Sequence, residues 1–229
     1  MRVAVINEVS TVARNRDIVE ALAGSGHEII NAGMRPGCAG PELTYIHIGF
    51  LSALLLNSKR VGFVVAGCGT GQGFQTSVEQ FPNVFCGHLQ TPLDAWLFAR
   101  INAGNCVSLA LNQGYGWGAD VNLRLVFEQL FGGEIADGYP SHRRDSQQQS
   151  RELLHAISRV THRSMAEIVH DLDNSVVVPV LEHPGVWDLL DVPTLEDRAL
   201  AEALEFRRCG RAVARLAGDP VVGMESTLK

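Results

Sequence analysis

The sequence has no CxxC pair, no long hydrophobic run and no excess of positive charge. Its five cysteines are odd in number and spread along 229 residues, which is typical of reduced thiols and argues against a disulfide framework. No apolar run approaches the roughly 20 residues that span a bilayer, and "MRVAVINEV" lacks a signal-peptide pattern. We therefore predict a soluble, cytoplasmic protein with no membrane partner.

The missing positive charge also bears on possible partners. A net charge of −6 gives no basic surface for nucleic acid, so we expect no nucleic-acid partner. The histidines follow no metal-binding spacing such as HExxH, so we expect no metal. Trp96, Trp117 and Trp187 are interpreted as core or interface aromatics.

Short β-branched runs alternate with helical patterns along the first 133 residues. Strands are predicted at 2–6, 27–33, 61–67, 83–88 and 106–112. Helices are predicted at 11–26, capped by Thr11, and at 43–58, 91–102 and 118–133. This order predicts an α/β fold, a three-layer α/β/α sandwich on a five-stranded parallel sheet that is Rossmann-like. Ligands of such sheets bind at the carboxyl ends of the strands, near a topological switch point.

The pattern becomes helical after residue 140. We predict two domains, an α/β domain over 1–140 and an α-helical C-terminal extension over 141–229. Its longest helix is predicted over 194–218, with Thr194 as its cap. The extension is expected to cover the core domain, a partner subunit, or both.

The stretch "VGFVVAGCGTGQG" (61–73) ends the third predicted strand in a run of glycines. Its spacing fails the G-x-G-x-x-G dinucleotide fingerprint, and it lacks the lysine of a Walker A loop. The glycines could simply relieve crowding in a tight turn. They also leave a ring of unobstructed backbone N–H groups, which together with the start of the next helix would stabilise an anion.

Cys68 lies within this stretch, where the adjacent helix start favours a thiolate. A thiolate can act as a nucleophile, normally with a histidine partner such as His47 or His88, or as a general base. A base beside an anion-binding loop suits removal of a proton α to a carbonyl, with the enediolate held by the loop. That is the chemistry of aldose–ketose isomerisation.

The sequence "AGCGTGQG" resembles the CGTG-x-G loop of the ribose/galactose isomerase family, which includes ribose-5-phosphate isomerase B and the galactose-6-phosphate isomerase subunits. The resemblance extends over residues 1–133 and includes "TYIHIG", "ARINAGN" and "LFGGE". It implies Cys68 as the catalytic base together with Thr70. It implies an enediolate-stabilising loop made of Gly67, Gly69, Gly71 and Gly73.

The resemblance also implies the reaction and the assembly. An intramolecular oxidoreductase would interconvert an aldose and a ketose, with a sugar phosphate such as a pentose-5-phosphate as substrate and without a cofactor. The family's sites form between subunits, so we expect a homodimer or a dimer of dimers with shared active sites.

Several positions depart from the family pattern. Asn7 and Glu8 replace an Asp-His pair, Ile101 replaces the histidine that assists ring opening, and Glu134 replaces an arginine of the phosphate clamp. We expect substrate to be bound by the residues that remain at or near these places, which are Asn7, Glu8, His47, His88, Asn102, Arg143 and Arg144.

These departures leave other hypotheses open. The isomerase could act on an open-chain or non-phosphorylated sugar. The chain could instead be a non-catalytic sugar-phosphate-binding protein that has lost its ring-opening histidine, or an enzyme that uses Cys68 covalently.

Overall fold

Five parallel strands form one sheet in the order β2-β1-β3-β5-β4 in the computed structural model, which describes residues 1–217 and their side chains as far as residue 209. The strands are β1 (Arg2–Asn7), β2 (Glu28–Asn31), β3 (Phe63–Cys68), β4 (Cys86–Leu89) and β5 (Cys106–Ala110). The chain winds to one side from β1 and to the other from β3. The topological switch point therefore lies between the carboxyl ends of β1 and β3.

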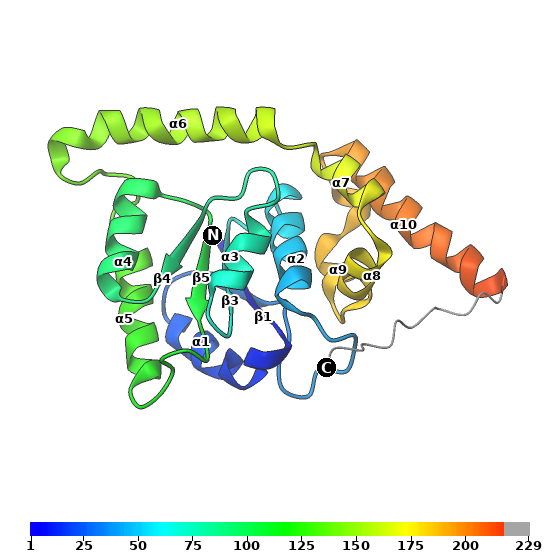
Figure 1. Ribbon diagram of the computed structural model, residues 1–229, viewed down its shortest axis with the longest axis horizontal. Helices are drawn as coiled ribbons and strands as arrows, with labels where there is room; N and C mark the ends of the chain where they lie inside the picture. Colours follow the sequence, from blue (N-terminus) through cyan, green and yellow to red (C-terminus); the bar gives the residue numbers. More distant parts are fainter. Residues whose placement is uncertain (218–229) are drawn as a thin grey trace, which may run out of the picture.

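Helices cover both faces of the sheet, which confirms the predicted sandwich (Figure 1). One face carries α2 (Tyr45–Asn57) and α3 (Gln72–Val78). The other carries α1 (Asn15–Leu22), α4 (Pro92–Leu97) and α5 (Ala119–Phe131). Each face has its own hydrophobic cluster, because alternate strand residues point to opposite sides.

The first crossover begins differently from the prediction. Glu8, and not Thr11, caps a short 3₁₀-helix, η1 (Val9–Arg14), by accepting a hydrogen bond from the Ser10 N–H at 3.0 Å. Thr11 is buried and donates its hydroxyl to the Glu8 carbonyl. The predicted cap was wrong because Glu8, one position after the strand, begins the helical turn three residues before Thr11.

The first helix of the C-terminal part, α6 (Arg144–Thr161), follows η2 (Phe98–Asn102) and η3 (Ser141–Arg143). It lies along the edge of the sheet where β4 and β5 begin, at the top of Figure 1. Arg151 donates to the Ile101 carbonyl at 2.8 Å, and Ser158 accepts from the Asn83 N–H at 2.9 Å. Both partners precede strands, so α6 is at the amino edge of the sheet.

The remaining helices form a group beside α2. They are α7 (Met165–Asp171), α8 (Asn174–Glu182), α9 (Val186–Leu190) and α10 (Arg198–Ala217). Of these, α8 packs directly on α2. They share one buried cluster with α2. This arrangement explains why α2 is apolar on all sides, as its sequence suggested: the sheet covers one side and α8 the other.

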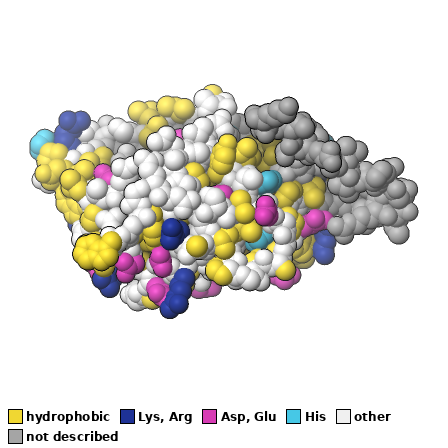
Figure 2. All heavy atoms as spheres, turned by 60° about the horizontal axis from the view of Figure 1, so that its bottom comes forward, with side chains coloured by type: hydrophobic (Ala, Val, Ile, Leu, Met, Phe, Trp, Pro, Cys, Tyr) yellow, Lys and Arg dark blue, Asp and Glu magenta, His cyan; other side chains and the backbone are white. Residues whose placement is uncertain are grey.

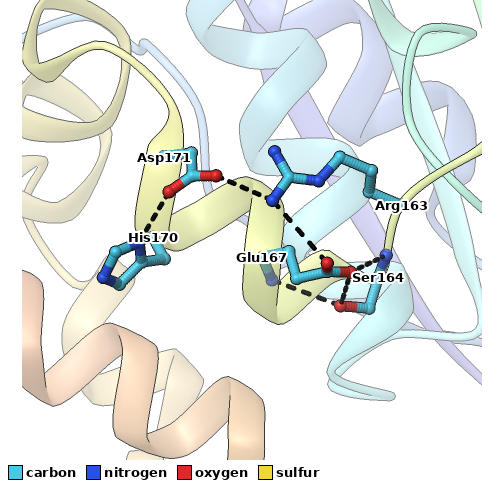
Figure 3. A network of polar contacts seen from close by, with 5 residues as sticks. All are labelled: Arg163, Ser164, Glu167, His170 and Asp171. Atoms are coloured by element: carbon cyan, nitrogen blue, oxygen red, sulfur yellow. Dashed lines mark hydrogen bonds and ion pairs between the residues drawn. The ribbon is translucent and has the colours of Figure 1, made fainter.

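Local polar contacts fix the ends of these helices. At the start of α7, Ser164 accepts from the Glu167 N–H, while Arg163 pairs with Asp171 at 2.7 Å and with Glu167 (Figure 3). The long helix α10 begins at Arg198 and not at the predicted Thr194, whose hydroxyl bonds Asp191 instead.

The division into domains at residue 140 stays a prediction. No helix in the described part of the chain combines the length and the apolar character needed to cross a membrane.

Candidate functional site

Cys68 is the last residue of β3 and is 6% exposed. It pairs with Ala110, and its carbonyl accepts from the Leu111 N–H at 3.0 Å, so the ladder continues one residue further than predicted. Gly67, just before it, pairs with Asn7 on one side and Leu109 on the other. A Cβ at Gly67 would lie 2.2 Å from the Leu109 carbonyl oxygen, so only glycine allows this close approach.

The rest of the Cys68 loop, which we define as residues 67–73, turns its carbonyls toward neighbouring elements. The Gly69 carbonyl accepts from the N–H groups of Asn112 at 3.0 Å and Gln113 at 2.8 Å. The Gly71 carbonyl accepts from the Ser108 hydroxyl at 2.5 Å. Thr70 is exposed, and its hydroxyl accepts from the N–H of Gln72, the first residue of α3, at 3.3 Å. Loop N–H groups and the helix start together offer donors to an anion.

Gly71 is the tightest position of the loop. It has a left-handed φ of 76° and precedes α3. A Cβ there would lie 2.3 Å from Cε1 of His88. His88 is thus in contact with the loop, as its place at the end of β4 suggested. Its Nδ1 is buried without a hydrogen-bond partner among the described residues, and its Nε2 lies 3.2 Å from Nε2 of Gln90.

Glu8 reaches the same edge of the sheet from β1. It is 5% exposed, and its carboxylate accepts from the backbone and hydroxyl of Ser10. Asn112 in turn donates to the Ser10 carbonyl at 3.2 Å, and its side chain lies 3.6 Å from a Cβ built at Gly69. Glu8, Ser10 and Asn112 therefore link the carboxyl ends of β1 and β5 to the Cys68 loop.

Asn7 and His47 have both side-chain polar ends engaged by the protein. Asn7 is fully buried, donates to the Thr11 carbonyl at 3.0 Å and accepts from Asn15 at 2.9 Å. His47 accepts from the Thr44 N–H at 3.0 Å and donates from Nε2 to the Ser175 carbonyl of α8 at 2.9 Å. Within this chain they hold η1 and the start of α2 in place.

Asn102, Arg143 and Arg144 lie at the opposite, amino edge of the sheet. Asn102 ends η2 just before β5, and the two arginines flank the start of α6. Asn102 lines a cavity of about 290 Å³ together with Arg151 and His155 of α6. One chain thus carries the Cys68 loop and these residues on separate edges.

A second cavity, of about 340 Å³, opens beside the Cys68 loop between β4, β5 and the start of α5. No three His, Cys, Asp or Glu side chains converge on a possible metal site within the described residues.

The family model for ribose/galactose isomerases matches residues 3–128. The chain belongs to the ribose/galactose isomerase family. A crystal structure of 4-deoxy-L-threo-5-hexosulose-uronate ketol-isomerase complexed with a tartrate is 33% identical to this family member, covering 91% of this chain and 100% of that one, with a TM-score of 0.86. A structure of ribose-5-phosphate isomerase from Vibrio parahaemolyticus is 34% identical over 91% and 98% of the two chains, with a TM-score of 0.82.

More distant members share the fold of this isomerase-family chain. The type B ribose 5-phosphate isomerase of Leishmania infantum is 16% identical, covers 70% of this chain and 98% of that one, and has a TM-score of 0.58. No curated protein sequence matches closely enough to count as a relative. The family and its two more similar structures identify the chain as a sugar isomerase in the general sense.

Three residues near the predicted site of this family member were missed from the sequence. The ring of Tyr45 lies 3.3 Å from a Cβ built at Gly73, although only His47 had been singled out in "TYIHIG". Asn112 supports the loop from β5, and Arg151 lies beside Asn102. The sequence offers one indication of Arg151: it is a positively charged residue on the first predicted helix after Glu134, which replaces an arginine of the family's phosphate clamp.

Proposed function

We propose that the protein is an aldose–ketose isomerase of an acidic sugar, with Cys68 as the base. The observation that carries the proposal is the position of Cys68, at the switch point between β1 and β3 and beside the glycine loop that leads into α3. A ligand site is expected at this point of a parallel sheet.

The reaction moves one carbon-bound proton and one hydroxyl proton, and it needs no oxidant or reductant. The Cys68 thiolate takes a proton from the carbon next to the substrate carbonyl, and the electron pair moves to the carbonyl oxygen. The resulting enediolate is held by the N–H groups of the Cys68 loop. The hydroxyl proton passes from the second oxygen of the intermediate to the former carbonyl oxygen, and the Cys68 thiol returns the carbon-bound proton to the former carbonyl carbon. These two transfers convert an aldose into a ketose.

The acidic group of the substrate is bound from a second copy of the chain. Asn102, Arg143, Arg144 and Arg151 lie on the edge opposite Cys68, so within one chain they cannot reach its substrate. The α6 helix exposes a stripe of Leu153, Leu154, Ile157 and Val160, which are 49–86% exposed. A contiguous apolar stripe of this kind is typical of a protein interface.

The substrate class follows from these groups. Arginine recognises phosphate and carboxylate alike through charge-assisted hydrogen bonds. A sugar phosphate remains our expectation, and a keto-uronate is the alternative favoured by the similarity to the uronate ketol-isomerase.

The test is incorporation of solvent deuterium into sugars, measured by NMR. Wild-type protein is incubated in D₂O with ribose 5-phosphate, with a hexuronate and with the unphosphorylated pentose. Exchange next to the carbonyl and formation of the ketose are expected for one acidic sugar. Binding without exchange would instead support a sugar-binding protein, and a mass adduct on Cys68 during turnover would support covalent catalysis.

Complementation tests the shared site. Cys68→Ser and Asn102→Ala homodimers are both expected to be impaired. A one-to-one mixture after subunit exchange is expected to recover about a quarter of the wild-type sites, because half of the dimers are mixed and carry one intact site each. No recovery in the mixture, with subunit exchange verified by mass, would argue for a site built within one chain.

A further inference from the structure

The cavity beside the Cys68 loop has a composition that differs from the arginine-bearing edge. We call it the Trp117 cavity. It measures about 340 Å³, and its lining includes Gln90, Gln113, Tyr115, Trp117 and Asn122. We infer that this cavity binds the uncharged, hydroxyl-bearing carbons of the substrate, with the Trp117 ring as a stacking surface. The inference rests on the proposed function, since it places the second end of the same sugar.

The cavity is joined directly to the candidate catalytic loop. Gln113 donates its backbone N–H to the Gly69 carbonyl at 2.8 Å. On the other side, Gln90 contacts His88, which packs against Gly71. The apolar lining of the cavity, Leu89, Leu109 and Leu123, belongs to the hydrophobic cluster on the other face of the sheet from Cys68. A molecule that fills the cavity therefore borders the Cys68 loop at the carboxyl edge of the sheet, and a sugar would have to cross that edge to reach Cys68.

The polar groups of the cavity are neutral amides. Gln90, Gln113 and Asn122 each carry donors and acceptors, which suits hydroxyl groups that both donate and accept. No charged side chain is among the described residues that line the cavity. Arg14, which lies over the Tyr115 ring at 4.5 Å, donates to the Leu111 carbonyl and is engaged there.

Because no charged side chain is among these described lining residues, a phosphate or carboxylate would find little compensation in the cavity for its lost hydration. Figure 2 turns the lower edge of Figure 1 toward the viewer, and charged, apolar and uncharged polar groups lie side by side on that face.

Trp117 explains how a neutral ligand gains affinity in such a place. Its side chain is fully exposed, at 106% of the reference value, in the loop "QGYGWGA" before α5. The other two indoles have partners: Trp96 contacts Tyr139 and Arg100, and Trp187 contacts Arg208. An indole in water at the mouth of an amide-lined cavity is an apolar surface that the C–H face of a sugar can cover.

Tryptophan fluorescence tests the inference without relying on turnover. Ribitol, a neutral pentitol that cannot isomerise, is titrated into the full-length protein, with inorganic phosphate as the charged probe. Ribitol is expected to change the tryptophan emission of wild type, Trp96→Phe and Trp187→Phe, and to leave the emission of Trp117→Phe unchanged. Phosphate alone is expected to have no effect on Trp117.

Two further measurements complete the test. Gln113→Ala is expected to weaken ribitol binding about 5-fold, as one lost hydrogen bond predicts, whereas Gln148→Ala, an exposed amide on α6, leaves it unchanged. Ribitol is also expected to inhibit deuterium exchange competitively, with an inhibition constant equal to its dissociation constant.

The outcomes separate this inference from the proposed function. The inference is overturned if the protein catalyses deuterium exchange but ribitol does not change the emission of Trp117, or if ribitol inhibits non-competitively. Either result leaves the proposed isomerase activity supported. A Trp117 response to phosphate but not to ribitol overturns the assigned ligand class. Ribitol binding at Trp117 without exchange on any acidic sugar supports the cavity and overturns the proposed reaction.

Discussion

Replacing Gly71 by alanine tests how tightly the Cys68 loop is built. Gly71 has φ 76°, and an added Cβ would lie 2.3 Å from Cε1 of His88 and 3.0 Å from the Leu109 carbonyl carbon. A left-handed φ costs a non-glycine residue about 1–2 kcal/mol, and overpacking a buried site costs about 1–3 kcal/mol more. We therefore expect Gly71→Ala to lower the free energy of unfolding by roughly 2–5 kcal/mol.

Gly37 provides a matched control. Its φ is 75°, and nothing lies within 4 Å of an added Cβ. Gly37→Ala should therefore cost only the backbone part, about 1–2 kcal/mol. Urea unfolding at a fixed protein concentration measures both variants, because concentration alters the stability of an oligomer. Gly71→Ala is also measured in a His88→Ala background. There it should lose less stability than in the wild-type background, because the imidazole that the new Cβ would meet is absent.

The comparison can refute the geometry of the loop. If Gly71→Ala and Gly37→Ala lose equal stability within about 0.5 kcal/mol, then His88 and Leu109 do not confine Gly71 as described.

Three further predictions concern other parts of the fold. Burial keeps the pKa of His183 below its ordinary value, so the unfolded chain takes up the proton first as pH falls below about 6.5 and the folded state loses stability. The urea concentration at the midpoint of unfolding should therefore drop between pH 7.5 and pH 5.5 by more in wild type than in His183→Gln. Equal drops in the two proteins would contradict this. Leu200→Ala, at a fully buried site of α10, should cost about 2–5 kcal/mol in urea unfolding. Its control is Leu93→Ala, which changes a side chain that is 63% exposed and should cost less than about 0.5 kcal/mol; equal losses in the two variants would contradict the burial of Leu200. Asn15→Ala removes the Nδ2 donor that lies 2.9 Å from the side-chain oxygens of Asn7 and Asn31, and it should lower the free energy of unfolding by about 2–4 kcal/mol. The double variant Asn15→Ala/Asn31→Ala should lose clearly less than the sum of the two single variants; simple additivity would argue against the amide network.

Most of the fold could be predicted because its signals are local. The β-branched runs ending at Asn7 and Cys68 are strands, and the glycine loop lies at a carboxyl edge as expected. Helix starts were harder to predict. Glu8 begins the helical turn three residues before Thr11 by accepting from the Ser10 N–H, and the Thr194 hydroxyl bonds Asp191. Sheet order depends on packing between distant segments and has no local signal.

The candidate site divides in the same way. Cys68, Gly71, Glu8 and His88 come together because each lies at the carboxyl end of a strand. Asn102 precedes the strand predicted at 106–112, so its place at the far edge follows from the order of the predicted elements. The engagement of His47 with α8 depends on a segment 128 positions away.

The most direct test of the account is the rate of solvent deuterium exchange in Cys68→Ser, measured with whichever acidic sugar the wild type converts. A serine hydroxyl keeps the shape of the thiol but ionises far less readily, so we predict a rate reduced by about 10²–10⁴-fold. The matched substitution Cys209→Ser, at an exposed cysteine, should leave the rate of deuterium exchange unchanged. Wild-type exchange in Cys68→Ser, with the fold intact by circular dichroism, would contradict the assignment of Cys68 as the base.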